Sequence, residues 1–381
     1  MYKLNYLNVT PLSSYSLLVT ENCNLACKYC YEENSSGHKN KNMSIETAKQ
    51  LLIYSFTESK KHNKKVDYSF FGGEPTLNID IIDYLCTQGK LLSKKYNISF
   101  SVNIITNATI MNKKIYNIFK KHSDVFTNCQ LSIDGHQIVQ DLNRITKNGK
   151  GSFNTIEKNI PYWKELFKDK LNIHGVLNHN TISELYNSYL FFREKWNVPM
   201  LWFLPAKDKK FTKNHVEIYD HEMNKIYNYI MERVRKDNSI FEIEAYAPLN
   251  RSLKNGGSSK PCGIGDNYCA VTAEGDIFPC HHLYFIDTKR ETLLGNIWNG
   301  IDKAKKLMWT VYDNSDIIGC QGCDHPYCYR CPAENYEKYG TPFVQIKDLH
   351  CDFMKVDLKY QRLIKNEIQQ MGLLNRGNKQ C

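Results

Sequence analysis

Between Ser16 and about Lys236, short apolar runs alternate with longer amphipathic stretches. The short runs predict six β-strands, at Ser16–Thr20, Val66–Phe71, Ile98–Thr106, Cys129–Ile133, Leu171–Leu177 and Met200–Leu204. Parallel neighbouring strands need crossover connections, so this order predicts a parallel sheet with helices outside it. Six strand–helix repeats are too few to close an eight-fold barrel, and we therefore expect an α/β fold with a partial (β/α)6 barrel of the TIM type. In such barrels the chemistry gathers where strands end and loops begin.

The amphipathic stretches carry helix signals. Ser44 is the expected N-cap of the first one, because apolar residues follow it at spacings of three and four from Ile45 to Phe56. Pro161 interrupts a later stretch, and a proline inside a helix removes a backbone hydrogen bond. We therefore expect Pro161 to split or kink that helix.

The sequence changes character beyond Asp237. Residues 250–261 are rich in Gly, Ser and Lys, which predicts a linker or mobile loop. Residues 262–351 show little helical periodicity except at 301–311, so we expect metal clusters, more than hydrophobic burial, to hold this part together. A helix is expected at 353–374. The expected divisions are an N-terminal extension (1–15), a barrel domain (16–237), a linker (238–261), a cysteine-rich domain (262–352) and a C-terminal helix and tail (353–381).

The composition is that of an ordinary globular chain. Of its 381 residues, 42% are apolar and 24% are charged, and no apolar run is long enough to span a membrane. The N-terminus lacks the layout of a secretory signal, which predicts a cytoplasmic protein without a membrane partner. The net charge of +10 comes with scattered lysines and no arginine cluster interleaved with aromatics, so we expect no nucleic-acid partner.

Cysteine carries most of the chemical information. The chain has 14 cysteines, although cytosolic proteins rarely use disulfides. Three lie within Cys23–Cys30 and eight within Cys262–Cys351, and such clustering indicates metal ligation. Cys86 and Cys129 fall in a helix and a strand pattern, so we expect both to be small buried hydrophobic residues. Cys381 has no readable role.

The first cluster directly follows the first predicted strand, with the spacing Cys23-x3-Cys27-x2-Cys30. Three thiolates on one short loop can bind three irons of a [4Fe–4S] cluster and leave the fourth iron open to a substrate or cofactor. A zinc site is the alternative, but structural zinc normally takes four protein ligands, and this loop offers three cysteines without a nearby histidine.

With this loop and the motifs that follow it, the chain resembles the radical S-adenosylmethionine (SAM) enzymes. The family signature is a three-cysteine loop with an aromatic residue before the last cysteine, here Tyr29. The stretch Gly72-Gly73-Glu74-Pro75 follows the second predicted strand and matches the family's motif for the methionine amino group. Glycines let the backbone approach closely, and a carboxylate accepts from an ammonium group.

The resemblance extends to motifs after the next strands. It implies that Asn107, Ser132 and Asp134 reach the ribose hydroxyls of SAM. It also implies that Arg144 pairs with the cofactor's carboxylate, a task that suits a guanidinium fork better than lysine. The implied cofactor-binding set is Tyr29, Gly72, Gly73, Glu74, Pro75, Asn107, Ser132, Asp134 and Arg144. No residue is assigned as a catalytic acid or base.

The eight cysteines of the second region are enough to ligate two further four-iron clusters. A zinc ribbon is the weaker alternative, because only four residues separate the two cysteine pairs. The region resembles a SPASM domain, the auxiliary-cluster extension of many peptide-modifying radical SAM enzymes. The resemblance implies one cluster on Cys262, Cys269, Cys280 and Cys331, and another on Cys320, Cys323, Cys328 and Cys351. Gaps of four and two residues, where five and three are commoner, leave the assignment of Cys328 and Cys331 open.

The resemblance implies an oxidoreductase that uses SAM and three [4Fe–4S] clusters on a peptide or protein. The leading hypothesis is maturation of a ribosomally made peptide through a thioether or carbon–carbon cross-link. The alternative is formylglycine formation of the anaerobic sulfatase-maturase type, although those enzymes usually carry an aspartate base where this chain has His281. A third hypothesis is a non-catalytic electron carrier, against which Glu74 and Arg144 argue, because a carrier needs no pocket for SAM.

Two further partners are expected. One is a reducing electron donor of the flavodoxin or ferredoxin type. About fifteen residues precede the first predicted strand, too few for a leader-binding domain, so leader recognition is expected from a separate protein or from the barrel mouth and tail.

Overall fold

The computed structural model describes residues 9–32, 40–206, 210–253, 262–311, 317–320, 322–323, 325, 328, 331–344 and 347–373. Part of the predicted N-terminal extension, the end of the predicted linker (residues 254–261) and the tail with Cys381 lie outside the described residues.

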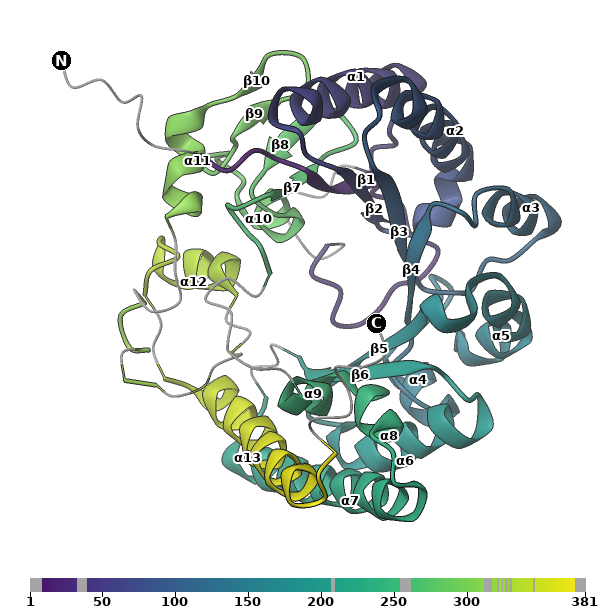
Figure 1. The fold of residues 1–381 in the computed structure, drawn as a ribbon, viewed down its shortest axis with the longest axis vertical. Coiled ribbons are helices and arrows are strands. Elements are labelled where there is room, and N and C mark those ends of the chain that lie inside the picture. The colour runs from purple at the N-terminus through teal and green to yellow at the C-terminus, as the bar shows by residue number, and fades with distance from the viewer. Residues whose placement is uncertain are drawn as a thin grey trace.

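A ten-stranded sheet runs through the molecule (Figure 1). Six strands pair in parallel in the order of the sequence: β1 (Ser14–Thr20), β2 (Val66–Gly72), β3 (Phe100–Thr106), β4 (Phe126–Ser132), β5 (Leu171–Leu177) and β6 (Met200–Pro205). All six predicted strands are present, with some ends displaced, because a hydrophobic pattern locates a strand better than its boundaries. The strands curve as a partial barrel with helices outside, as expected (Figure 1).

The helices of the barrel part are α1 (Ile45–His62), α2 (Ile79–Tyr96), α3 (Lys113–Lys121), α4 (Gln137–Asn143), α5 (Phe153–Phe167), α6 (Leu185–Leu190) and α7 (Lys213–Asp237). Short turns of other helical types occupy Pro75–Asn78, Lys168–Lys170, Ile182–Glu184 and Phe191–Lys195. The predicted N-cap is confirmed, because the Ser44 hydroxyl accepts a hydrogen bond from the Thr47 backbone N–H at 3.0 Å. None of the described helices is long and apolar enough to cross a membrane.

Of the prediction that Pro161 splits or kinks its helix, the split is wrong, because α5 runs without interruption through Pro161. A kink at Pro161 stays a prediction. The proline lies on the exposed side of α5, so water can satisfy the carbonyl group that its missing N–H leaves unpaired. The other side of α5 is anchored by buried residues that include Ile156, Ile160 and Trp163.

Four more strands extend the sheet beyond β1, which we did not expect from the sequence. β7 (Tyr268–Val271) pairs in parallel with β1, and β8 (Asp276–Phe278), β9 (Gly295–Asn296) and β10 (Gly300–Ile301) continue in antiparallel fashion. The pairing covers the edge of β1, whose backbone groups would otherwise be unpaired. The cysteine-rich part therefore begins as a continuation of the barrel sheet.

Hydrophobic burial in this extension is extensive. Val271, Ile277, Leu283 and Phe285 are completely buried, and most of the apolar residues here share the core of the barrel strands. The expectation that this part has little hydrophobic burial is therefore wrong for the described residues, whereas the contribution of metal clusters stays a prediction. The sequence pattern misled us because each strand is too short to show a period, although its neighbour β1 supplies the missing core.

The predicted linker contains two short helices, α8 (Phe241–Glu244) and α9 (Ala247–Asn250), and a 3-10 turn at Arg251–Leu253. Tyr246 and Leu249 are completely buried, and the backbone N–H of Leu201 in β6 donates to the Ala245 carbonyl at 2.8 Å. The described part of the predicted linker, residues 238–253, therefore packs as part of the barrel.

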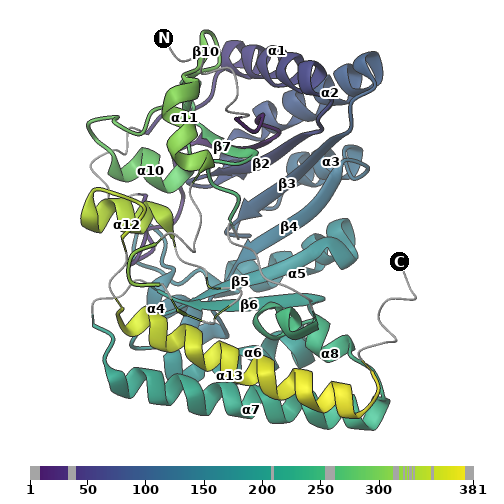
Figure 2. The same ribbon diagram turned by 60° about the vertical axis from the view of Figure 1, so that its left-hand side comes forward.

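The described residues after β8 include the helices α10 (His281–Ile286), α11 (Lys303–Thr310), α12 (Pro332–Tyr339) and α13 (Leu349–Gln370). α13 lies along α7, as both Figure 1 and Figure 2 show. It begins before the predicted position at residue 353, and Cys351 therefore lies in its first turn rather than in a loop.

A buried acid joins α13 to α7. The Tyr219 hydroxyl donates a hydrogen bond to Asp357 at 2.7 Å, and Asp357 is only 2% exposed. Burial raises the pKa of Asp357 to about 6, against the opposing influence of Tyr219 and Arg251. Because this pKa is higher in the folded than in the unfolded chain, the fold is most stable when Asp357 is protonated and loses stability as the pH rises through 6.

We expect the free energy of unfolding to fall by about 1 kcal/mol from pH 5 to pH 7 on account of this group. Asp357→Asn retains an acceptor for Tyr219 but does not ionise, so the variant should show a weaker pH dependence of its melting temperature. Asp352→Asn, on the exposed side of α13, is the matched control. Equal pH dependence in Asp357→Asn and the unmodified protein would contradict the expectation.

Candidate active site

The loop with Cys23, Cys27 and Cys30 leaves the end of β1 and rests on the segment that follows α4. The backbone N–H of Ala26 donates to the Ile145 carbonyl at 2.8 Å, and that of Lys28 donates to the Asn143 carbonyl at 3.0 Å. These bonds fix the loop at the edge of the sheet where the parallel strands end, which is where we expected the chemistry.

The sulfur of Cys23 accepts two hydrogen bonds from neighbouring groups. The Leu25 backbone N–H donates to its Sγ at 3.4 Å, and the Asn107 side chain donates to the same sulfur at 3.7 Å. Burial, followed by the nearby Glu74 carboxylate, raises the pKa of Cys23 to about 12. The sulfur would bind iron as a thiolate, and a bound iron would supply the positive charge that favours this form.

The donor set fits an iron–sulfur cluster by its chemistry, since three thiols within eight residues are the soft ligands that such clusters take. Among the described residues, no group of three or more His, Cys, Asp or Glu side chains is arranged around a common point as a metal site. The fit therefore depends on the identity and spacing of the ligands.

The glycine pair of the GGEP motif braces the cysteine loop. Gly73 donates its N–H to the Thr20 carbonyl at 3.0 Å, and the Glu74 N–H donates to the Asn22 carbonyl at 2.8 Å. A Cβ atom on Gly73 would lie 2.3 Å from the Asn22 oxygen, and Gly72 has a φ of +108°. Only glycine allows β2 to end so close to the backbone of the loop.

Glu74 joins the ends of β2 and β3. One carboxylate oxygen accepts hydrogen bonds from the Thr76 N–H (3.1 Å), the Thr76 hydroxyl (2.7 Å) and the Thr106 hydroxyl (2.7 Å), and the other accepts from the Asn107 N–H (2.7 Å). Glu74 is completely buried, which raises its pKa against the opposing effect of these bonds. In this structure both oxygens serve the protein's own donors, and the implied contact with an ammonium group remains a prediction.

Glu74→Gln tests this arrangement. Each carboxylate oxygen accepts one backbone N–H, so the amide nitrogen of glutamine would face a donor in either orientation. We expect a loss of about 2 kcal/mol in the free energy of unfolding and a weaker hold on iron. Thermal unfolding and iron analysis check this, with Glu232→Gln on the exposed side of α7 as control. A variant as stable and as iron-rich as the control would contradict it.

Asn107 orients Cys23. Its side-chain amide donates to Asn24 at 2.9 Å as well as to the Cys23 sulfur, and its carbonyl oxygen accepts from the Thr109 N–H at 3.0 Å. Asn24 in turn donates to the Thr109 hydroxyl at 2.8 Å. This network connects the end of β3 to the cysteine loop, whereas the implied ribose contact of Asn107 remains a prediction.

Arg144 and Asp134 are bound to each other. The Arg144 Nε donates to Asp134 at 2.9 Å, the Tyr29 hydroxyl donates to the other oxygen at 2.5 Å, and the Val176 N–H donates to Asp134 at 3.1 Å. The Arg144 guanidinium also lies 5.4 Å from the centre of the Tyr29 ring. Burial acts to lower the pKa of Arg144, but Asp134 and Tyr29 hold it well above its usual value.

This geometry changes the expected role of Asp134. Its carboxylate is completely buried and accepts from three donors of the chain, so in this structure it holds Arg144 instead of presenting itself to a ribose. Ser132, at the end of β4, is partly exposed and lies in register with His174 of β5. The sequence could not reveal the ion pair, because ten residues and a helix separate its partners.

Two buried amides at this edge have no partner among the described residues: the side-chain nitrogens of Asn143 and Asn178. Asn143 also holds the cysteine loop through its carbonyl, and Asn178 directly follows β5. Buried amide donors are normally paired. Acceptor oxygens and nitrogens of a nucleoside with a carboxylate group would suit them, which agrees with a SAM site. An asparagine directly after a predicted strand was the signal that we overlooked.

The second cysteine region does not bring all its predicted ligands together. The thiols of Cys262, Cys280 and Cys331 lie within electrostatic reach of one another. Cys269, in contrast, is completely buried beside Tyr15 on the other face of β7. Tyr268, which precedes Cys269 in β7, lies within electrostatic reach of Cys262 and Cys280. Since successive side chains of a strand point to opposite faces, Cys269 faces away from the other three thiols, and the predicted set of four is not assembled in this structure.

The other predicted set lies near the start of α13. Cys320 and Cys323 share a turn in which the Cys323 N–H donates to the Cys320 carbonyl at 3.0 Å. Lys355 lies within electrostatic reach of both Cys323 and Cys351. Cys328 is partly buried against the core. Cys86 and Cys129, by contrast, are completely buried in α2 and β4, as predicted.

The cysteine-rich part meets the barrel mouth through His281. The rings of His281 and Phe71, at the end of β2, are 4.2 Å apart, and the Tyr268 hydroxyl lies 3.1 Å from the His281 Nδ1. Tyr31, just after Cys30, lies 5.0 Å from the ring of His282. Sequence reasoning missed Phe71 and Tyr31, since an aromatic residue at a strand or loop end carries no specific signal.

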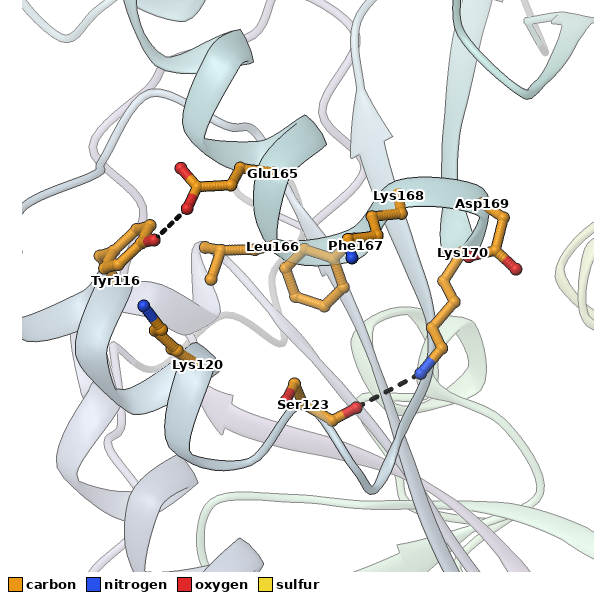
Figure 3. Close-up of a pocket in the computed structure, with 9 residues that line it drawn as sticks. All are labelled: Tyr116, Lys120, Ser123, Glu165, Leu166, Phe167, Lys168, Asp169 and Lys170. Atoms are coloured by element: carbon orange, nitrogen blue, oxygen red, sulfur yellow. Dashed lines mark hydrogen bonds between the residues drawn. The ribbon is translucent and has the colours of Figure 1, made fainter.

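A cavity of about 410 Å³ lies at the opposite edge of the sheet, between α3, α5 and the start of β5 (Figure 3). Its polar groups pair within the chain: the Tyr116 hydroxyl donates to Glu165 at 2.5 Å, and Lys170 donates to the Ser123 carbonyl at 3.3 Å. The cavity lies where strands begin, away from the cysteine loop, and we assign it no part in the site.

Comparison with known proteins identifies the family of the chain. The family model for the radical SAM superfamily matches residues 17–192. A cysteine-type anaerobic sulfatase-maturating enzyme of Clostridium novyi is 27% identical over 296 residues, 72% of this chain and 75% of the relative. An uncharacterized protein of Methanocaldococcus jannaschii is 30% identical over 292 residues, 76% of this chain and 90% of the relative. The radical SAM cyclopropyl synthase TigE of Paramaledivibacter caminithermalis is 23% identical over 380 residues, 93% of this chain and 75% of the relative.

Among solved structures, native anSMEcpe with bound AdoMet and Cp18Cys peptide superposes with a TM-score of 0.71. The match covers 94% of this chain and 99% of that one at 22% identity, which establishes a shared fold. Radical SAM enzymes carry a [4Fe–4S] cluster and use SAM, for which the loop of Cys23, Cys27 and Cys30 provides the donor set. From the family match, the relatives and the fold, we conclude that this chain is an enzyme of the radical SAM superfamily.

Proposed function

We propose that this enzyme oxidatively modifies a peptide at the mouth of its barrel. The observation that carries the proposal is the contact of His281 with Phe71 at 4.2 Å, which brings the cysteine-rich part against the end of β2, beside the cysteine loop. The neighbouring residue Cys280 belongs to the group of three thiols described above. A second redox group held there would lie beside the reaction centre, which suits a reaction that removes two electrons.

When bound, the cluster and SAM supply a radical that removes one hydrogen atom from the substrate. An oxidised product requires that one more electron and one proton leave, and auxiliary clusters on the second cysteine region would accept the electron. In this proposal Cys23, Cys27 and Cys30 bind three irons, and Asp134 and Tyr29 hold Arg144 toward the cofactor's carboxylate. A flavodoxin- or ferredoxin-type donor would reduce the first cluster, and a separate protein would present the leader of the substrate.

The leading form of this reaction is a thioether or carbon–carbon cross-link in a ribosomally made peptide. Anaerobically reconstituted enzyme, a reductant, SAM and a precursor peptide encoded next to this gene provide the test. A peptide lighter by two hydrogen atoms supports the proposal. An unchanged peptide, with SAM cleaved in its presence as fast as in its absence, contradicts it.

A second form, formylglycine formation on Cys or Ser, is favoured by the sulfatase-maturating enzymes among the relatives. His281 occupies the position of the aspartate base that the resemblance implies, and Tyr268 contacts its Nδ1. The Cp18Cys peptide bound by anSMEcpe is a direct probe. Aldehyde formation on that peptide, detected by hydrazide capture, would favour this form, whereas a cross-link in the precursor peptide would exclude it as the main activity.

A further inference from the structure

The inner face of β4, β5 and β6 carries a polar row, of which only Ser132 belongs to the implied cofactor-binding set. Ser132 pairs with His174, and His174 pairs with Trp202, in the register of three neighbouring strands. The ring centres of His174 and Trp202 are 4.6 Å apart. Their strand neighbours Ile173 and Leu201 are completely buried in the core. Because side chains alternate along a strand, the row faces the inside of the barrel.

Two atoms of this row are buried and unpaired. Within the part of the chain that the structure describes, neither the His174 Nε2 nor the Trp202 Nε1 has a hydrogen-bond partner. An unpaired buried polar atom costs about 1–3 kcal/mol, and native structures contain few of them. Two such atoms side by side on an interior surface indicate that a group from outside the chain completes them.

The chemistry of the two rings defines that group. An indole N–H only donates, so its partner is an acceptor. Burial, together with the charge of Arg144, lowers the pKa of His174 to about 3, so the imidazole is neutral at physiological pH and donates through one nitrogen. One oxygen can accept from both rings, and the nearby positive charge of Arg144 favours an oxygen with high electron density, such as a carbonyl oxygen.

The depth of the row separates it from the cofactor residues. His174 precedes Val176 by two positions on the same face of β5, and the Val176 N–H binds Asp134. Two strand residues span about 7 Å, so the row lies one layer deeper in the barrel than the pair of Asp134 and Arg144. A group bound by His174 and Trp202 therefore lies below the pair of Asp134 and Arg144 that would hold the cofactor.

We propose that His174 and Trp202 bind a carbonyl oxygen of the peptide substrate and thereby select which of its residues reaches the radical. This inference rests on the proposed function. It adds a substrate-positioning site on the floor of the barrel, in which the imidazole and the indole donate to the same oxygen.

The test compares two affinities in anaerobically reconstituted enzyme, measured by calorimetry: that for SAM alone, and that of the SAM-loaded enzyme for the Cp18Cys peptide or the precursor peptide. Trp202→Phe keeps a ring but removes the N–H, and we expect it to weaken peptide binding about tenfold while SAM affinity stays unchanged. His174→Leu should act similarly, and His174→Gln, which retains an N–H donor, should restore most of the affinity. Trp298→Phe, at a side chain that is 48% exposed in the cysteine-rich part, is the control.

Unchanged SAM affinity also shows that each variant folds. Equal weakening of SAM and peptide binding would assign the oxygen to the cofactor and overturn the inference. Unchanged binding of both would mean that the row serves only in packing, which would also overturn the inference. An unmodified enzyme that binds SAM but neither peptide would overturn the proposed function, and the inference with it. Normal peptide binding by all row variants would overturn the inference alone.

Discussion

Replacing Cys27 by alanine is expected to abolish reductive cleavage of SAM, with at least a thousandfold loss in the rate of 5′-deoxyadenosine formation. A thousandfold loss in rate corresponds to about 4 kcal/mol in the activation free energy. A four-iron cluster held by only two thiols is not retained, so the variant should also lose about four irons per chain. Chromatographic quantification of 5′-deoxyadenosine and iron analysis after anaerobic reconstitution give the two readouts.

Cys86→Ala is the matched control for Cys27→Ala. Cys86 is completely buried in the core between α2 and the sheet, and no iron role is expected of it. The control should keep its iron and its cleavage activity, with at most a modest loss of stability from the small cavity. Full iron content and undiminished SAM cleavage in Cys27→Ala would contradict the assignment of the cysteine loop as the iron-binding site.

The second large effect concerns the cysteine-rich part. Cys323→Ala is expected to stop product formation while SAM cleavage continues at a reduced rate, because the radical can still form but the second electron has no exit. Cys323 shares its turn with Cys320. Lys355 lies within electrostatic reach of both Cys323 and Cys351. The measured quantity is the ratio of modified peptide to 5′-deoxyadenosine, which should fall more than tenfold.

Cys269→Ala tests whether Cys269 is an iron ligand or a residue of the hydrophobic core. Cys269 faces Tyr15 on the helix side of β7, so this variant should keep the iron content and the product ratio of the unmodified enzyme. Cys280→Ala, on the other hand, should lose iron. If Cys269→Ala lost as much iron as Cys280→Ala, our reassignment of Cys269 would be wrong. If Cys323→Ala lost SAM cleavage and product formation to the same extent, the cluster implied on Cys320, Cys323, Cys328 and Cys351 would be only structural.

The barrel was predictable because its signals are local. Each of the six strands is a short apolar run, and Ser44 satisfies the first turn of α1 through bonds three residues away. The failures have physical reasons of the same kind. Pro161 is tolerated because its side of α5 faces water, and β7 to β10 are too short to show a period but are stabilised by pairing with β1.

The candidate site was predictable as a set of residues but not as an arrangement. The spacing of Cys23, Cys27 and Cys30 on one loop can be read directly from the sequence. The pairing of Arg144 with Asp134 is not, because it requires β4, α4 and the following loop to meet. His281 likewise reaches Phe71 only because β7 joins the sheet beside β1.

The sequence by itself determined which residues offer thiol groups as ligands, since side-chain chemistry belongs to each residue, and it determined the strand–helix alternation, since periodicity is a property of neighbouring residues. The tertiary structure alone decided which thiols and which polar groups share a space. Cys269 and Cys280 are the same residue type, but β7 places Cys269 in register with Tyr15, whereas Cys280, after β8, lies within electrostatic reach of Cys331. Likewise, only the parallel register of β5 and β6 places His174 beside Trp202, because contacts between distant residues depend on the pairing of whole strands.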